Sequence, residues 1–183
     1  SLVPFAASSI PLVTLGTFLL WFGWFGFNGF SQLAMGTFDD VNAISKIAVN
    51  THLAGAAGTA TAALISRLLG GKTDIIMMLN GALAGLVAIT AEPLTPSPLL
   101  AILIGAIGSL IMYFGTKFLE SKKIDDVVGA IPVHMFAGIF GTLIVPLSNA
   151  DTNFGTQLTG VISVCLFSFV LSYLTFRGLK ETI

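Results

Sequence analysis

The sequence has 183 residues, of which 55% are hydrophobic and only 9% are Asp, Glu, Lys or Arg, with a formal net charge of −1. Soluble domains carry roughly 25% charged residues, so this composition excludes most soluble globular classes, disordered chains and nucleic-acid-binding proteins. The mean hydropathy of +0.94 and the 20 glycines indicate instead a polytopic membrane protein. The single cysteine, Cys165, allows no internal disulfide.

Apolar runs long enough to cross a bilayer follow one another along the chain. A spanning helix needs roughly 20 mostly apolar residues. We therefore predict an all-α membrane protein with six spans, at residues 10–30, 44–69, 75–89, 99–119, 127–145 and 158–176. Gly81 and Gly85 form a GxxxG pattern, and pairs of small residues recur on three other spans. Such residues are typical of closely packed membrane helices, and we interpret them as packing positions.

The basic residues predict an orientation. Seven of the eight lie in or beside alternate loops: Arg67, Lys72, Lys117, Lys122, Lys123, Arg177 and Lys180. The opposite side carries four acids and a single cation, Lys46. Because cytoplasmic loops are enriched in Lys and Arg, we expect a protein of the cell membrane with a cytoplasmic C-terminus.

The first span is unusual in its outer half. Residues 19–31 contain six aromatic side chains, and Gly23, Gly26 and Gly29 alternate with them every three residues. One interpretation is an aromatic belt at the level of the lipid headgroups. The other is an outer vestibule for a small cation, which aromatic faces can hold. Asn28 and Ser31 lie at the same level as these rings.

Two histidines are the other candidate functional residues. His134 lies well inside the fifth predicted span among apolar neighbours, and ionisable residues at such depth are functional candidates. A neutral imidazole can donate and accept a hydrogen bond, which suits a proton or a small polar molecule; packing against a neighbouring helix is the alternative. His52 lies near the outer end of the second span, where packing is favoured. Neither histidine has the partners of a metal or haem site, so we expect no metal and no cofactor.

Four segments resemble the ammonium transporter/Rh family, in the order expected of it: residues 16–31, 49–58, 80–90 and 125–143. The resemblance implies an eleven-helix channel built from two inverted repeats and a final helix, assembled as a homotrimer. This chain is similar to the second half of that fold, the second repeat plus the final helix. The resemblance also implies that a first repeat, on the same polypeptide or on a separate chain, completes the pore.

The resemblance assigns roles to particular residues. It implies that His134 is one of two pore histidines that handle the proton, that Phe27 is part of the outer gate, and that Ser31 helps to bind ammonium in the outer vestibule. Trp24 matches a position beside this site, Asn28 lies at the vestibule level, and Thr90 is adjacent to the pore.

Two positions depart from the family pattern. Phe30 stands where a small residue is usual, which would narrow the vestibule. Gly129 stands where many members carry an Asp. Asp125 and Asp126 match the start of the fifth helix, where acids suit the helix dipole.

These features predict transport of ammonium or ammonia, with the cation recruited at the aromatic vestibule and deprotonated before conduction past the histidine. The alternative is an ammonium-sensing module coupled to a signalling domain, and a third possibility is a membrane bundle without a ligand. The expected partners are ammonium, membrane lipid, further copies in a trimer and a cytoplasmic regulatory protein, but no nucleic acid. No catalytic motif is present, so we do not expect an enzyme.

Overall fold

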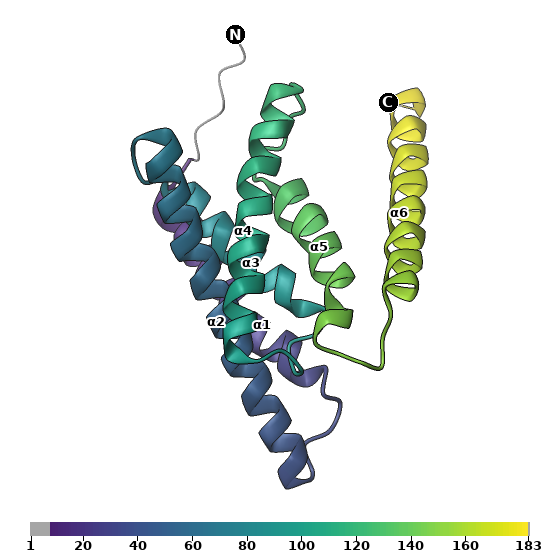
Figure 1. Ribbon diagram of the computed structural model, residues 1–183. Coiled ribbons are helices and arrows are strands. Elements are labelled where there is room, and N and C mark those ends of the chain that lie inside the picture. The colour runs from purple at the N-terminus through teal and green to yellow at the C-terminus, as the bar shows by residue number, and fades with distance from the viewer. Residues whose placement is uncertain (1–7, 183) are drawn as a thin grey trace.

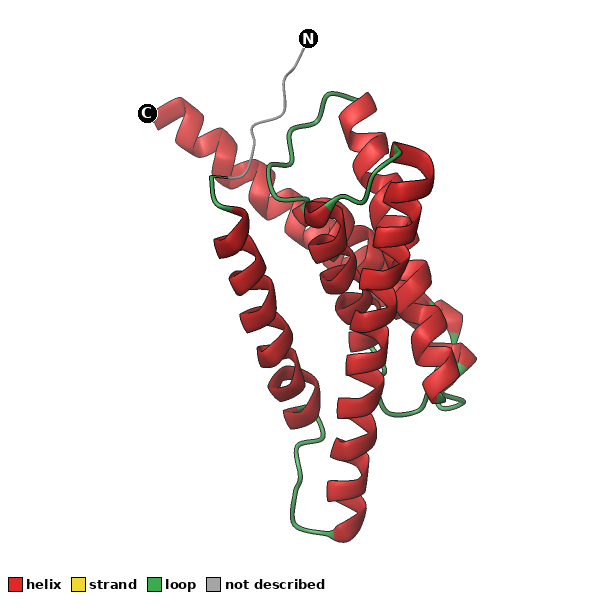
Figure 2. Ribbon diagram, turned by 90° about the vertical axis from the view of Figure 1, so that its left-hand side faces the viewer, coloured by secondary structure: helices red, strands yellow, loops and turns green. Residues whose placement is uncertain are grey.

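Helices account for nearly all of the chain that the structure, a computed structural model, describes, which is residues 8–182 (Figure 1). The six α-helices are α1 (Ile10–Phe30), α2 (Phe38–Gly70), α3 (Ile75–Thr90), α4 (Pro98–Ser121), α5 (Ala137–Leu143) and α6 (Phe154–Thr182). A π-helical segment, η1 (Ile131–Phe136), runs directly into α5, and a short 3-10 turn, η2 (Val145–Leu147), follows it. Within residues 8–182 there is no strand (Figure 2).

The lengths and composition of these helices fit a membrane. α1, α2, α4 and α6 are long and apolar enough to cross a bilayer, and Ile75–Thr90 and Ile131–Leu147 form two shorter apolar helices. This confirms the predicted all-α membrane fold with six helices.

Side-chain caps fix where the helices begin. Thr37 and Asp40 form a capping box at the start of α2, in which each side chain bonds to the other's backbone amide. α2 consequently starts at Phe38, six residues before the predicted span, because hydropathy detects the apolar stretch and not the polar first turn. Ser9, Asp74 and Ser97 cap α1, α3 and α4 through their side-chain oxygens.

The core of the bundle is formed by α2, α3 and α4, which approach one another at glycines. A Cβ atom added to Gly58 would lie 2.2 Å from the carbonyl oxygen of Gly81, and one added to Gly85 would lie 2.3 Å from that of Ala54. Ser109 of α4 donates a hydrogen bond of 2.8 Å to the carbonyl oxygen of Gly58. The small residues therefore act as the packing positions predicted from the sequence, and they bring backbone against backbone.

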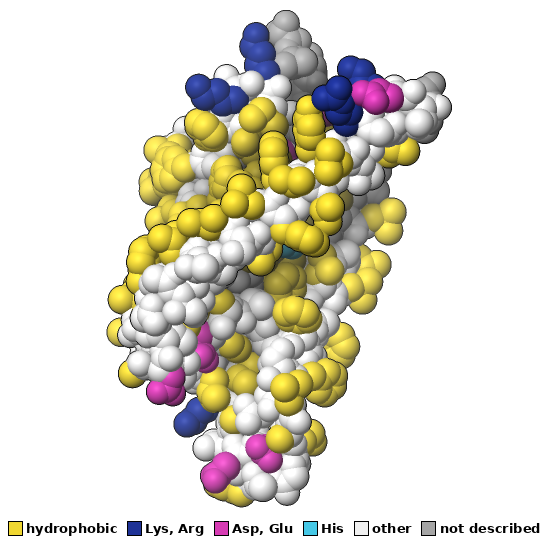
Figure 3. Space-filling view, turned by 90° about the vertical axis from the view of Figure 1, so that its right-hand side faces the viewer, with side chains coloured by type: hydrophobic (Ala, Val, Ile, Leu, Met, Phe, Trp, Pro, Cys, Tyr) yellow, Lys and Arg dark blue, Asp and Glu magenta, His cyan; other side chains and the backbone are white. Residues whose placement is uncertain are grey.

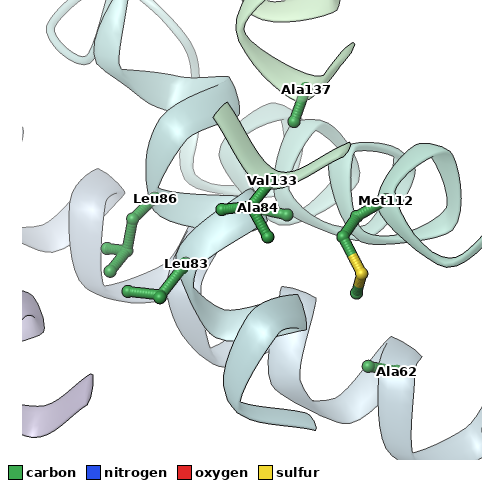
Figure 4. Close-up of a cluster of buried hydrophobic side chains, with 7 residues drawn as sticks. All are labelled: Ala62, Leu83, Ala84, Leu86, Met112, Val133 and Ala137. Carbon is green, nitrogen blue, oxygen red and sulfur yellow. The ribbon is translucent and has the colours of Figure 1, made fainter. Parts of the chain in front are cut away.

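A cluster of buried apolar side chains joins the π-helical segment to this core. Met112 from α4 and Val133 from η1 are almost fully buried beside residues of α2, α3 and α5. Figure 4 shows the whole cluster: Ala62, Leu83, Ala84, Leu86, Met112, Val133 and Ala137. η1 is thus seated on the rigid core by its apolar side.

α6 stands apart from the other helices (Figure 1). It contacts only α5 and η2, and none of its residues is buried against the rest of the described chain. Large apolar side chains cover its surface, as they cover much of α1. Both helices therefore present surfaces suited to lipid or to another protein.

Charge is divided between the two ends of the bundle. In the view of Figure 3, most Lys and Arg side chains gather at one end, while the other end carries acids and one basic side chain. The middle of the same face is dominated by hydrophobic side chains. This arrangement matches the division of charge from which the orientation in the membrane was predicted.

Candidate functional site

An open depression of about 530 Å³ lies along the C-terminal end of α1. Its lining residues are Gly23, Gly26, Phe27, Phe30, Ser31 and Leu33. Phe27 is 64% exposed, and a Cβ atom on Gly23 would meet nothing within 4 Å. Gly23 thus leaves one side of the helix open, and the rings of Phe27 and Phe30 line the same depression. The structure brings Phe27, predicted for the outer gate, and Ser31, predicted for the vestibule, into one depression.

The hydroxyl of Ser31 has a defined orientation. Ser31 Oγ donates a hydrogen bond of 2.8 Å to the carbonyl oxygen of Phe27, one helical turn earlier. Since a hydroxyl has one donor and two acceptor lone pairs, this bond leaves the acceptor side of Ser31 free. The rim of the depression therefore presents an acceptor beside an aromatic face.

Phe30 lines the same depression as Phe27 and Ser31. Its ring covers Gly26, where an added Cβ atom would lie 3.5 Å from the ring edge. The departure from the family pattern at Phe30 is therefore located in the predicted vestibule itself.

Trp24 and Thr90 form a support behind Phe27. Trp24 Nε1 donates a hydrogen bond of 2.7 Å to Thr90 Oγ1, and Thr90 Oγ1 in turn donates one of 2.6 Å to the carbonyl oxygen of Leu86. The Trp24 and Phe27 rings meet edge to face, with centroids 6.3 Å apart. Neither Trp24 nor Thr90 lines the depression, and Trp24 meets it only through its contact with Phe27.

Asn28 faces a different neighbour. It is 2% exposed, and its Nδ2 donates a hydrogen bond of 2.9 Å to Oγ1 of Thr51, which is fully buried. The structure therefore places Asn28 in the interface between α1 and α2, outside the depression that Phe27 and Ser31 line. The sequence indicated its level along the helix and not the face on which it lies.

His134 lies in the π-helical segment η1, away from the depression. Pro132 and Val133 are buried on the core side of this segment, whereas His134 and Met135 are exposed in the described chain. π-helical turns inside longer helices are frequently found at functional sites. An exposed imidazole on an otherwise apolar membrane helix is available to a group from outside this chain.

The start of η1 is held by residues that the sequence only partly indicated. The carboxylate of Asp126 accepts hydrogen bonds from the backbone amides of Ala130 and Ile131, both at 2.9 Å. This is the helix-start role expected for an acid at that position. Asn80 of α3 also contacts this turn, through a hydrogen bond of 3.2 Å from Nδ2 to the carbonyl oxygen of Val128. Sequence reasoning missed Asn80 because the partner is 48 residues away.

His52 packs against two aromatic rings of α1. The centroid of its ring lies 5.5 Å from that of Trp21 and 6.2 Å from that of Phe25. These contacts fit the packing interpretation of His52. Within residues 8–182, no three His, Cys, Asp or Glu side chains are grouped as metal ligands.

Comparison with known proteins identifies the family. Residues 3–183 match the sequence profile of the Ammonium Transporter Family. The chain is 45% identical over 151 residues to "Ammonium transporter Amt2" of Archaeoglobus fulgidus, covering 82% of this chain and 31% of that protein. It is 34% identical over 187 residues to "Ammonium transporter Amt1" of Haloferax mediterranei, covering 96% of this chain and 36% of that protein. The chain thus spans about a third of the length of these relatives, which are named as transporters and not as enzymes.

Solved structures show the same fold. The chain superposes on a protein named "Sensor Amt Protein" with a TM-score of 0.87 and 36% identity, over 95% of this chain and 45% of that one. It superposes on Candida albicans Mep2 with a TM-score of 0.85 and 27% identity, over 95% of this chain and 42% of that one. With the family profile matching almost every residue, the chain belongs to the ammonium transporter family.

Proposed function

We propose that this chain supplies one half of an ammonium-conducting pore, with a cation site at the depression on α1 and a proton-handling group at His134. The observation that carries the proposal is the depression itself, in which the Phe27 ring and the free acceptor side of Ser31 lie together. Relatives at 45% and 34% identity are named ammonium transporters, which supports the same substrate.

The depression suits a small cation that carries N–H donors. An aromatic face attracts a cation by about 0.5–2 kcal/mol, more strongly as water is removed. The Ser31 oxygen can accept one N–H group, replacing part of the hydration shell. Phe27 is held edge to face by Trp24, so its ring is already oriented before the cation arrives.

The passage beyond this site requires loss of charge. Moving an unpaired ammonium ion into a dry, apolar pore costs several kcal/mol or more. A neutral ammonia molecule avoids most of this cost if the proton is left with a group that can accept it. His134, exposed on an apolar helix, is the residue that we assign to this step, with its counterpart supplied by the other repeat.

We further propose how the pore is completed. His134 and much of α1 are exposed in the described chain, so a first repeat, on the same polypeptide or on a separate one, would cover them. The proposal includes a homotrimer in the cell membrane, a cytoplasmic C-terminus set by the basic end of the bundle, and contact there with a regulatory protein. Liposomes that contain only residues 1–183 are then expected to show no ammonium flux, and flux through them would contradict a half-pore.

The test compares the two histidines. Replacing His134 by Ala in the complete pore-forming protein should change ammonium-evoked current or methylammonium uptake by at least about ten-fold, since a proton-transfer group typically contributes 10²–10⁴-fold. His52→Ala is the matched control, because His52 packs against Trp21 and Phe25 and takes no part in the proposed path. An unchanged current and selectivity in His134→Ala would remove this residue from the mechanism.

Sensing is the second candidate function. It is favoured by the superposition with a protein named "Sensor Amt Protein", at a TM-score of 0.87. A sensor would bind ammonium at the same depression without net flux. Ammonium-dependent thermal stabilisation that depends on Phe27 and Ser31, in a complete protein that passes no current, would favour sensing over transport.

A further inference from the structure

A side chain from another helix holds the turn that precedes η1. The first helical backbone bond at this end runs from Val133 N to the carbonyl oxygen of Gly129, four residues earlier, at 3.2 Å. The carbonyl oxygen of Val128 lies before that bond, in a turn where Gly129 has a φ of +75°. Its hydrogen-bond partner comes from outside this segment.

That partner is a side chain of α3. Asn80 Nδ2 donates a hydrogen bond of 3.2 Å to the carbonyl oxygen of Val128. The backbone amides of Ala130 and Ile131, at the start of the helix, donate to the carboxylate of Asp126. The amides at the start of this segment are thus held from within it, whereas the partner of the Val128 carbonyl comes from a different helix.

Gly129 makes room for this contact. A Cβ atom at residue 129 would lie 2.6 Å from Asn80 Nδ2, and the backbone there has a φ of +75°, which residues other than glycine rarely adopt. An Asp at this position would displace the Asn80 amide. The departure from the family pattern at Gly129 is therefore matched to the position of Asn80.

We propose that Asn80 is a positioning residue for His134: it ties the turn before η1 to α3, and so fixes the direction of the imidazole. This inference rests on the proposed role of His134. The turn that follows is π-helical, closed by a bond from Ala137 N to the carbonyl oxygen of Pro132. If the π turn relaxed to an α turn, the register would shift by one residue, which is roughly 100° about the helix axis.

The first measurement needs no transport. In the complete protein, Asn80→Leu keeps a side chain of similar size but removes the donor, and amide hydrogen exchange at residues 130, 131, 133 and 134 should rise roughly three- to ten-fold, as for loss of one net hydrogen bond.

The second measurement tests positioning. Asn80→Leu should move the midpoint of the pH profile of ammonium flux by about half a unit or more. The matched control is Asn42→Leu, the same change at an exposed position near the start of α2, far along the chain from η1. This control should leave both readouts unchanged.

Two results would overturn the proposal. Amide exchange left unchanged by Asn80→Leu would show that the Asn80 contact does not hold this turn. Altered exchange with an unmoved pH profile would show that the contact exists but does not position His134. Failure of the proposed function is recognised separately, by a His134→Ala variant whose ammonium flux equals that of the wild type. The two failures are distinguishable because the exchange measurement does not depend on flux.

Discussion

Replacing Gly105 by Ala is predicted to force α4 away from α2. The added Cβ atom would lie 2.1 Å from the carbonyl oxygen of Ala54, 2.6 Å from its Cα and 2.7 Å from its carbonyl carbon. Real Cβ contacts do not fall below 3.0 Å, so the two backbones must separate by about 0.9 Å. All three opposing atoms are backbone atoms, and Ala54 is fully buried, so no rotamer change relieves the contact.

The expected cost follows from two opposing effects. Overpacking in a well-packed core costs typically about 1–3 kcal/mol, and a backbone clash on a helix interface belongs at the upper end or beyond. Ala is better than Gly in a helix by up to about 1 kcal/mol, which offsets part of this. We therefore expect Gly105→Ala to lower the free energy of unfolding by about 2 kcal/mol.

The assay is reversible SDS unfolding of the detergent-solubilised protein, followed by tryptophan fluorescence. Gly160→Ala in α6 is the matched control, because a Cβ atom there meets nothing within 4 Å and the substitution should be neutral or slightly stabilising. If Gly105→Ala proved as stable as Gly160→Ala, the close contact of α2 and α4 described above would be refuted.

Two further predictions concern hydrogen bonds. Thr90→Val removes the acceptor of the 2.7 Å bond from Trp24, so it should lower the free energy of unfolding by about 1–3 kcal/mol and shift the tryptophan emission. Thr90→Ser keeps the hydroxyl and should retain the wild-type stability and emission. Equal stability of the two variants would contradict the role assigned to this hydrogen bond. At the exposed start of α2, hydrogen bonds from Thr37 lower the pKa of Asp40 from 3.8. The stabilisation by the ionised Asp40 is therefore complete above pH 3.8 and is lost as the pH falls through the lower pKa of the folded state. Amide exchange in the first turn of α2 should rise as the pH falls below 3.8. Asp40→Asn should remove this dependence of exchange on pH.

The sequence predicted the helices better than their ends. The first and third predicted spans, residues 10–30 and 75–89, lie within a residue of α1 and α3, since polar or capping residues flank each apolar run. The fifth, 127–145, begins before its helix, because Asp126 and Gly129 shape a non-helical turn up to residue 129. No local pattern predicts a π turn, which depends on contacts with other helices.

The candidate site shows a similar division. Phe27 and Ser31 are four residues apart at the end of one helix, so their shared position follows from helical periodicity alone. Asn28 is adjacent in sequence but faces α2, and its partner Thr51 is 23 residues away. The contact of Asn80 with Val128 spans 48 residues. Pairs of this kind are set by helix packing, which a single sequence does not display.

The isolation of α6 bears on how the protein is made. α6 buries no residue against the rest of the described chain, so contacts with those helices contribute little to its insertion into the bilayer. Its insertion is therefore expected to depend on its own hydrophobicity. Arg177 and Lys180 lie at its end, and positive charges of this kind are the ones expected to orient a span. Exchange of these two residues for neutral ones is therefore expected to disturb insertion more than the packing of the described bundle.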